Sequence, residues 1–396
     1  MDDHAALPMT LAGVEVLDLG TMVTAPLAGM MLADMGASVL KIEHPQGGDP
    51  FRRFRSGLYS PNFVAYNRNK RSMTLDLKSE DGLIILRRLI ERADVLIENF
   101  RPGVMDRLGL DRERIQAINP RLVQCSITGF GASGPYRARP AFDTVGLALS
   151  GVASLFVDPD DPHVAGPTIA DNVTGMYACS GILGALFERQ RSGVGRHVEV
   201  NMLESSIALI PDPIANFTQA GICNDRMTRV AASHSFVFRC ADGKLIALHL
   251  SFPEKFWQGL LAAIDRPEIV EDERFATREN RVQNYMALET TLAASIETRP
   301  RDHWIARFEE NDLPFAPVNS IPEVFDDPQV RHLGTFAEVD HPLEGRVVGI
   351  RCPISIDGAR GTFKPPPVLG EHTAAVLAEL GYSESDVSAL RRSSVV

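Results

Sequence analysis

The sequence predicts an α/β fold with a parallel sheet, followed by a second and smaller α+β domain. Two observations indicate this. Over roughly the first half of the 396 residues, short apolar runs of strand type alternate with amphipathic helical patterns, as in proteins built from β-α-β units. From residue 228 the pattern changes to a β-hairpin followed by helices. A chain of this length is long enough for two domains.

The first β-α-β unit opens the chain. Residues 14–19 predict a strand, residues 26–35 a helix that Gly36 ends, and residues 38–43 a second strand. The turn between the first strand and the helix lacks the G-x-G-x-x-G pattern of dinucleotide-binding enzymes. A conventional dinucleotide dehydrogenase is therefore disfavoured.

The remaining elements follow in order. We expect further strands at residues 73–77, 95–98, 122–127 and 196–200, and helices at 79–93, 112–118, 142–156, 174–190 and 202–220, the last broken near Pro211 and Pro213. The smaller domain should contain a hairpin of residues 236–240 and 244–250, with helices at 253–264 and within 284–311. Prolines 314, 317 and 322 indicate a linker, and strand and helix patterns return at 347–356 and 374–380.

A single acid, Asp171, stands at the start of a long helical pattern, within the stretch 166–175. One interpretation is a helix cap, in which the carboxylate accepts the free N–H groups of the first turn. The other is a carboxylate nucleophile, which needs an ionised oxygen in a closed pocket. The two are compatible, because a helix N-terminus favours the ionised form.

Basic residues gather in one region although the net charge is −11. They are Arg52, Arg53, Arg55, Arg68, Lys70 and Arg71. One explanation is a solvated face, and the other is a site for a phosphate-rich ligand, since Arg and Lys suit phosphate. The overall charge gives little support to a role in binding nucleic acid.

Other features narrow the class of protein. The N-terminus lacks the basic-then-apolar pattern of a signal peptide, and no apolar run approaches the ~20 residues that span a bilayer. The five cysteines are scattered, with no spacing typical of a zinc site or a disulfide framework. We expect a cytoplasmic protein that binds no membrane and no metal.

Several short stretches, in their shared order, resemble class III CoA-transferases, the family of formyl-CoA and carnitine CoA-transferases, to which α-methylacyl-CoA racemase is related. The stretches are Val16-Leu17-Asp18, Ala33-Asp34-Met35-Gly36-Ala37, Val39-Leu40-Lys41-Ile42-Glu43, Asn69-Lys70-Arg71-Ser72, Glu98-Asn99-Phe100-Arg101-Pro102-Gly103, Met105-Asp106-Arg107-Leu108-Gly109, Gly129-Phe130-Gly131-Ala132-Ser133-Gly134-Pro135, Gly181-Ile182-Leu183-Gly184-Ala185-Leu186 and Leu369-Gly370-Glu371-His372-Thr373. Each is a weak signal alone, and their common order is specific.

The resemblance implies an interlocked homodimer whose large domain is Rossmann-like and built from both chain ends. We accordingly assign residues 1–205 and 335–396 to the large CoA-binding domain and 228–315 to the small α+β domain. Residues 206–227 would form a linker helix and 316–334 a second linker. In the family the active site lies between the large domain of one chain and the small domain of the other.

The resemblance also implies the chemistry. Asp171 matches the family's catalytic aspartate, which forms a mixed anhydride and then an aspartyl-CoA thioester. The implied CoA contacts are Lys70, Arg71, Asn99, Phe100, Arg101, Arg107 and Leu108, with Val23 and Thr24 in the first turn. Coenzyme A would be a substrate, and no tightly bound cofactor is expected. The expected partners are an acyl-CoA and a carboxylic acid, whose identities the sequence does not give.

Two departures from formyl-CoA transferase argue against oxalate and formate as substrates. Val23 stands where that enzyme has a glutamine, and residues 231–235 replace its tetraglycine loop. Within this replacement, His234 could orient an acceptor carboxylate, or it could be a loop histidine with no such role.

Two alternative functions are considered. A racemase of this superfamily pairs its aspartate with a histidine in a Gly-His-Asp segment, because removal and delivery of a proton need two acid/base groups. Phe142 occupies the histidine position here, in Ala141-Phe142-Asp143, and cannot exchange a proton. The second alternative is a silent CoA-binding subunit that works with an active paralogue. The presence of Asp171 argues against it.

Overall fold

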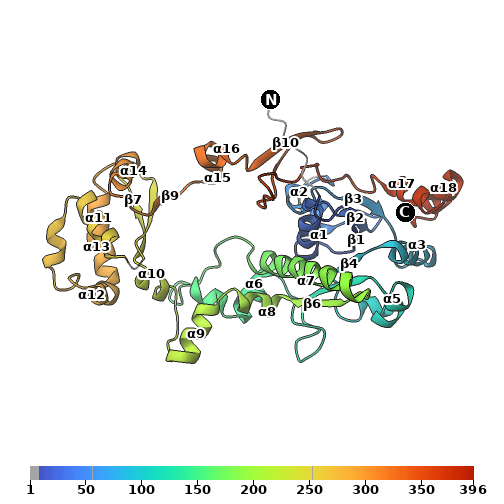
Figure 1. The fold of residues 1–396 in the computed structure, drawn as a ribbon, viewed down its shortest axis with the longest axis horizontal. Coiled ribbons are helices and arrows are strands. Elements are labelled where there is room, and N and C mark those ends of the chain that lie inside the picture. Colours follow the sequence, from blue (N-terminus) through green and yellow to red (C-terminus); the bar gives the residue numbers. More distant parts are fainter. Residues whose placement is uncertain (1–8, 56, 252) are drawn as a thin grey trace. The chain divides into compact units, whose positions relative to one another are not determined.

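The computed structural model describes residues 9–55, 57–251 and 253–396. The chain divides into two compact units (Figure 1). Unit 1 comprises the described residues up to Ala153 together with Gly166–Ile210 and His332–Val396, and unit 2 comprises Ser154–Ala165 and Pro211–Arg331. Each unit has its own hydrophobic core.

Unit 1 is organised around a six-stranded parallel sheet in the order β3-β2-β1-β4-β5-β6. The strands are β1 (Glu15–Asp18), β2 (Ser38–Glu43), β3 (Arg71–Thr74), β4 (Val95–Glu98), β5 (Val123–Thr128) and β6 (His197–Asn201). The α/β prediction is confirmed. Because the order reverses between β1 and β4, loops that follow these two strands diverge there and leave a crevice, where open α/β sheets bind their ligands.

The helices of unit 1 cover both faces of this sheet. They are α1 (Thr24–Asp34), α2 (Pro61–Tyr66), α3 (Glu80–Arg92), α4 (Val104–Arg107), α5 (Arg112–Ile118), α6 (Asp143–Leu149), α7 (Ala170–Ser192), α8 (Met202–Ala208), α17 (Thr373–Glu379) and α18 (Glu384–Arg392), with 3₁₀ turns at Pro50–Arg53 and Val152–Leu155. Ser79 caps α3, accepting the Gly82 N–H at 3.0 Å. Gly193, in a left-handed conformation, ends α7.

One face of the sheet is covered by α1 and α7, which approach each other closely. A Cβ built on Gly175 of α7 would lie 2.7 Å from the Thr24 carbonyl oxygen at the start of α1. Only glycine allows this approach. The contact therefore sets the first turns of the two helices side by side.

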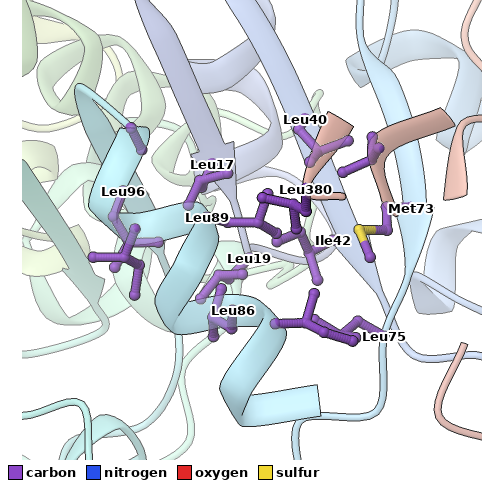
Figure 2. Packing of buried hydrophobic residues seen from close by; sticks show 14 of the residues in the cluster. Leu17, Leu19, Leu40, Ile42, Met73, Leu75, Leu86, Leu89, Leu96 and Leu380 are labelled. Atoms are coloured by element: carbon purple, nitrogen blue, oxygen red, sulfur yellow. The ribbon is translucent and has the colours of Figure 1, made fainter. Parts of the chain in front are cut away.

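The other face is covered by α3 and α5 and by the two C-terminal helices. Leu380, which follows α17, lies in one cluster with Leu17 of β1 and Leu86 of α3 (Figure 2). The segment that follows β3 also bonds to Val395, since the Asp76 N–H donates to the Val395 carbonyl at 2.7 Å. Both ends of the chain thus build the core of unit 1.

Unit 2 contains a three-stranded antiparallel sheet, β7 (Ser235–Arg239), β8 (Leu245–His249) and β9 (Phe315–Pro317). Its helices are α9 (Pro211–Ala220), α10 (Thr228–Ala232), α11 (Glu254–Ala263), α12 (Arg278–Gln283), α13 (Tyr285–Ile296), α14 (Arg301–Glu310) and α15 (Ile321–Asp326), followed by α16 (Pro328–His332), and a 3₁₀ turn spans Pro267–Glu271. The expected hairpin is confirmed as β7 and β8. The proline-rich stretch begins with an edge strand, where a missing N–H is tolerated.

Several elements differ from the sequence-based expectation. Gly151, at φ +86°, interrupts the helix expected at 142–156. The strand expected at 347–356 is β11 (Gly345–Ile350), the second arm of a hairpin with β10 (Phe336–His341). No helix within the described residues is both long and apolar enough to cross a membrane.

Candidate active site

The loops that follow β1 and β4 line the two sides of the crevice between these strands. Asn99, directly after β4, joins them: its Oδ1 accepts the Thr21 N–H at 3.0 Å, and its Nδ2 donates to the Thr21 carbonyl at 2.9 Å. A pocket of about 300 Å³ opens beside this junction. It is lined by residues 21–24, 99–102, 127–129 and 139–142, with Arg137, Asp171 and Met202.

Asp171 belongs to the first turn of α7, and its carboxyl is mostly buried in this pocket. The N-cap of α7 is Ile169, without a side-chain hydrogen bond to the first turn among the described residues. The Asp171 N–H donates instead to Oδ1 of Asp143, the first residue of α6, at 3.2 Å. Burial, and then the charge of Asp143, raise the pKa of Asp171 to about 6. The carboxyl is therefore largely ionised at pH 7 and is more basic than an exposed aspartate.

Asn172 and Tyr66 stand next to Asp171. The Asn172 side chain donates to the Thr168 carbonyl at 2.5 Å and also hydrogen-bonds to the Tyr66 side chain. Burial raises the pKa of Tyr66 and the charge of Asp171 adds to this, which keeps the phenol protonated. Sequence reasoning missed Tyr66, because nothing in the sequence relates it to a residue more than a hundred positions later.

A network of fully buried charges lies beneath the loop after β1. Lys70 donates from Nζ to Asp18 Oδ2 and the Pro26 carbonyl, both at 2.8 Å, and to Asn67 Oδ1 at 2.9 Å. Lys41 donates to the Gly20 carbonyl at 2.6 Å. Burial alone would raise the pKa of Asp18, but the two lysines lower it. The network therefore fixes the loop after β1 and the first turn of α1.

The structure brings together some of the expected site residues and places others elsewhere. Asp171, Val23, Thr24, Asn99, Phe100 and Arg101 line one pocket. Among the described residues, four expected CoA contacts lie outside that lining. Lys70 is buried in the charge network, Arg71 pairs with Glu379 of α17 at 2.7 Å, Arg107 is exposed at the end of α4, and Leu108 packs against the core.

Three arginines line the pocket, and two of them were not expected from the sequence. Arg101 was expected, whereas Arg137 and Arg139 belong to the loop before α6. All three are exposed, and the Arg139 guanidinium lies 3.8 Å from the centre of the Tyr136 ring. Arg101 and Arg137 also line an adjoining pocket of about 440 Å³. The sequence did contain a signal for Arg137 and Arg139, which follow Gly134-Pro135. Two cations in a loop beside a glycine-rich turn suit an anionic ligand.

The other residues considered from the sequence are Phe142 and His234. Phe142 lines the pocket at the start of α6 and offers no proton-transferring group. His234 belongs to unit 2, where it is only 3% exposed. Burial, followed by the charges of Arg281 and Arg278, lowers its pKa to about 4, so the imidazole is neutral at pH 7.

A family model, characterised relatives and a solved structure all match this chain over most of its length. The model of CoA-transferase family III matches residues 11–373. The succinate–glutarate CoA-transferase of Agrobacterium fabrum is 36% identical over 383 residues, which are 93% of this chain and 95% of that protein. A formyl-CoA:oxalate CoA-transferase of Escherichia coli is 31% identical over 412 residues, covering 98% and 99% of the two chains. The crystal structure of a CaiB/BaiF family protein from Brucella suis, 34% identical, superimposes with a TM-score of 0.84 over 95% of this chain and 100% of that one.

Proposed function

The chain belongs to CoA-transferase family III, and from this premise we propose that Asp171 transfers CoA between carboxylic acids as a covalent nucleophile. The observation that carries the proposal is the environment of this carboxyl. It lies in a pocket at the reversal point of the sheet, with a pKa raised to about 6. Such a group is ionised at neutral pH and is a better nucleophile than an exposed aspartate.

The proposed reaction proceeds in four steps. The Asp171 carboxylate attacks the thioester carbonyl of the donor, the C–S bond breaks, and a mixed anhydride and CoA thiolate form. The thiolate attacks the aspartyl carbonyl, which gives an aspartyl-CoA thioester and releases the donor carboxylate. The acceptor carboxylate then attacks the aspartyl carbonyl and expels CoA thiolate. That thiolate attacks the acceptor acyl carbonyl and regenerates Asp171.

Each step passes through an oxyanion next to the first turn of α7. The Asn172 N–H belongs to this turn and has no partner within the helix. We assign it to stabilise the oxyanion at the aspartyl carbonyl, as a fixed backbone donor at a helix N-terminus can. The anhydride would be hydrolysed by water, so the substrate must fill the pocket during the reaction.

The decisive experiment is to trap the covalent intermediate. The purified chain is incubated with a panel of acyl-CoAs, quenched with hydroxylamine and digested for mass spectrometry. A hydroxamate on Asp171 supports the proposal and identifies the donor. Deuterium entering the acyl α-carbon without an adduct would favour a racemase. Neither signal, with CoA binding retained, would favour a silent CoA-binding subunit.

The rate of acylation should depend on pH through Asp171. Because the ionised carboxylate is the nucleophile, kcat/KM should decline below about pH 6. Asp143→Asn removes the neighbouring negative charge and retains an oxygen that can accept the Asp171 N–H. The pKa of Asp171 should then decrease, and the acid limb of the profile should move to lower pH. The shift should be partial, since burial is the larger cause.

The control for this profile is Glu91→Gln, the same chemical change at an exposed position of α3. It should leave the acid limb in place. An acid limb that is identical in the wild type and in Asp143→Asn would show that the charge of Asp143 does not act on the nucleophile.

We propose that the acids are dicarboxylic, as the name of the Agrobacterium relative gives for that enzyme, succinate and glutarate. Arg101, Arg137 and Arg139 supply positive charge in the pocket wall, which suits a distal carboxylate or a phosphate of CoA. Arg139→Gln should therefore raise KM for the acyl-CoA about tenfold and change kcat by less than about threefold, because it removes binding energy common to ground and transition states.

Matched substrates distinguish the two anions. If Arg139→Gln raises KM for succinyl-CoA but not for butyryl-CoA, Arg139 contacts the distal carboxylate. If Arg139→Gln raises KM equally for both thioesters, and raises it less for the corresponding dephospho-CoA thioesters, Arg139 contacts the 3′-phosphate. Arg391→Gln, at an exposed position of α18, is the control and should change neither KM. An unchanged KM in Arg139→Gln would contradict the assignment.

We further propose a homodimer. Met176, Tyr177 and Phe187 of α7 are 50%, 42% and 69% exposed, and α9 has no buried residue although it carries Ile214 and Phe217. Apolar side chains exposed in such numbers are typical of protein interfaces. Sedimentation equilibrium should give twice the chain mass.

A further inference from the structure

We propose that Asp49 is a positioning residue for the reaction, although it does not line the catalytic pocket among the described residues. It holds Met22 in a left-handed conformation within residues 21–24, which form one wall of that pocket. The inference rests on the proposed role of Asp171 and adds a second requirement, a fixed wall beside the nucleophile. Its support comes from the conformation of one residue and from the contacts of one buried carboxylate.

The residue is Met22, which has a φ of +64°. This region of backbone conformation is natural for glycine and unfavourable for a side chain with a Cβ, by about 1 kcal/mol or more. Such a conformation persists only where the surroundings impose it. Met22 lines the pocket, as do its neighbours Thr21, Val23 and Thr24. The strain is therefore located in the wall of the candidate active site.

Asp49 supplies the contact that imposes this conformation. Its carboxylate is 1% exposed, and both of its oxygens lie 3.1 Å from the Met22 N–H. The carboxylate is itself fixed, because Oδ1 accepts the Phe51 N–H at 2.9 Å and Oδ2 pairs with Lys41 Nζ at 3.0 Å. A buried carboxylate held from two other sides acts as a rigid acceptor for Met22.

Other anchors act on the residues on either side of Met22, because Asn99 Nδ2 also donates to Thr24 Oγ1 at 3.1 Å. Asp18 and Lys41 bind the two backbone groups of Gly20, and Asn99 binds both backbone groups of Thr21. These contacts fix where the turn begins. Between Thr21 and Thr24, the backbone direction is set at Met22, whose N–H donates to Asp49.

The residues after Met22 lead directly to the nucleophile's helix. Val23 and Thr24 begin α1, and Thr24 packs against Gly175, one turn after Asp171. A rotation at Met22 would therefore shift the first turn of α1 relative to Asp171. Misplacement of a reacting group by about 1 Å can reduce a rate by roughly 100-fold. Asp49 should thus affect kcat far more than substrate binding.

The test combines Asp49→Asn with two substitutions at position 22. Asp49→Asn alone should lower the single-turnover acylation rate by roughly 100-fold and change KM less than about threefold. Met22→Gly and Met22→Ala both remove the methionine side chain, but only glycine adopts positive φ without penalty. In the Asp49→Asn background, the glycine variant should therefore be at least about tenfold faster than the alanine variant.

Several outcomes would overturn the inference. One is a wild-type acylation rate in Asp49→Asn, and another is equal rates in the glycine and alanine double variants. A third is a loss of rate in Asp49→Asn that a lowered thermal transition explains entirely. If Asp49→Asn does not fold, Met22→Val and Met22→Gly are compared with Asp49 intact. Valine, which is β-branched, should be at least about tenfold slower than glycine, and equal rates would refute the requirement for the turn.

Trapping of the wild type separates the two proposals. A wild-type chain that forms no hydroxamate on Asp171 contradicts the proposed function, whatever the Asp49 variants do. A wild-type chain that forms the hydroxamate, with unimpaired acylation in Asp49→Asn, contradicts only the positioning role.

Discussion

Asp171→Asn is expected to abolish CoA transfer and, at the same time, to stabilise the folded protein. The loss of activity should be about 10⁴-fold or more, because the amide cannot form the acyl-enzyme intermediate. Single-turnover acylation and hydroxylamine trapping measure it directly. Glu91→Gln, the same kind of change at an exposed site, should retain full activity. Residual transfer within about tenfold of the wild type would exclude Asp171 as the nucleophile.

The gain in stability follows from the raised pKa of Asp171. The Asp171 carboxyl has a pKa of about 6 in the folded chain, whereas an aspartate in an unfolded chain has its ordinary pKa of 3.8. Between these values the folded state binds more protons, so the Asp171 contribution to stability decreases as pH rises through this window. Asp171→Asn should therefore be more stable than the wild type at pH 7, by about 1–3 kcal/mol, and no more stable below about pH 4. Urea unfolding at the two pH values tests this difference.

Lys70→Met is expected to destabilise unit 1 by about 3–5 kcal/mol, because it leaves the carboxylate of Asp18 buried without its nearest cation. A role for Lys70 as a CoA contact makes a different prediction, a raised KM for CoA with little change in stability. Urea unfolding followed by circular dichroism, together with KM measurements, separates the two. A stable variant with a raised KM would favour the contact.

The chain contains its own control for this experiment. Both tryptophans, Trp257 and Trp304, lie in the core of unit 2, so intrinsic fluorescence follows unit 2 while circular dichroism follows both units. Lys70→Met should change the dichroism transition more than the fluorescence transition. Lys78→Met, at an exposed position after β3, should change either by less than about 0.5 kcal/mol.

The sequence predicted the parts of the site that follow from local pattern. Asn99, Phe100 and Arg101 directly follow a buried strand, and parallel strands present the residues after their carboxyl ends at one edge of the sheet. Asp171 was proposed because it stands at the start of a long helical pattern within a recognisable order of motifs, and it lines the same pocket as these residues. Its raised pKa could not be predicted, because Asp143 is 28 positions away and burial is not visible in the sequence.

Pairings between distant segments explain why the other features could not be predicted from the sequence. Six cations close together in the sequence suggested a phosphate site, yet Arg52 bonds to Glu43, Arg68 to Asp34 and Lys70 to Asp18, all inside unit 1. Composition identifies such charges but not their partners. The missed strand β10 has another cause: its residues are half-exposed, so they lack the strong apolar alternation that predicts a strand.

The participation of the C-terminal helices in the core of unit 1 has a consequence for the newly made chain. Ribosomes synthesise the polypeptide from its amino end, so Leu380 and Val395 emerge after every strand of the central sheet. The central sheet is then already outside the exit tunnel, with one face still lacking α17 and α18. Unit 2 draws nearly all its residues from one continuous segment and needs no such delay. We expect unit 2 to become protease-resistant during translation, and unit 1 to do so later, only after residues 373–395 have emerged from the ribosome.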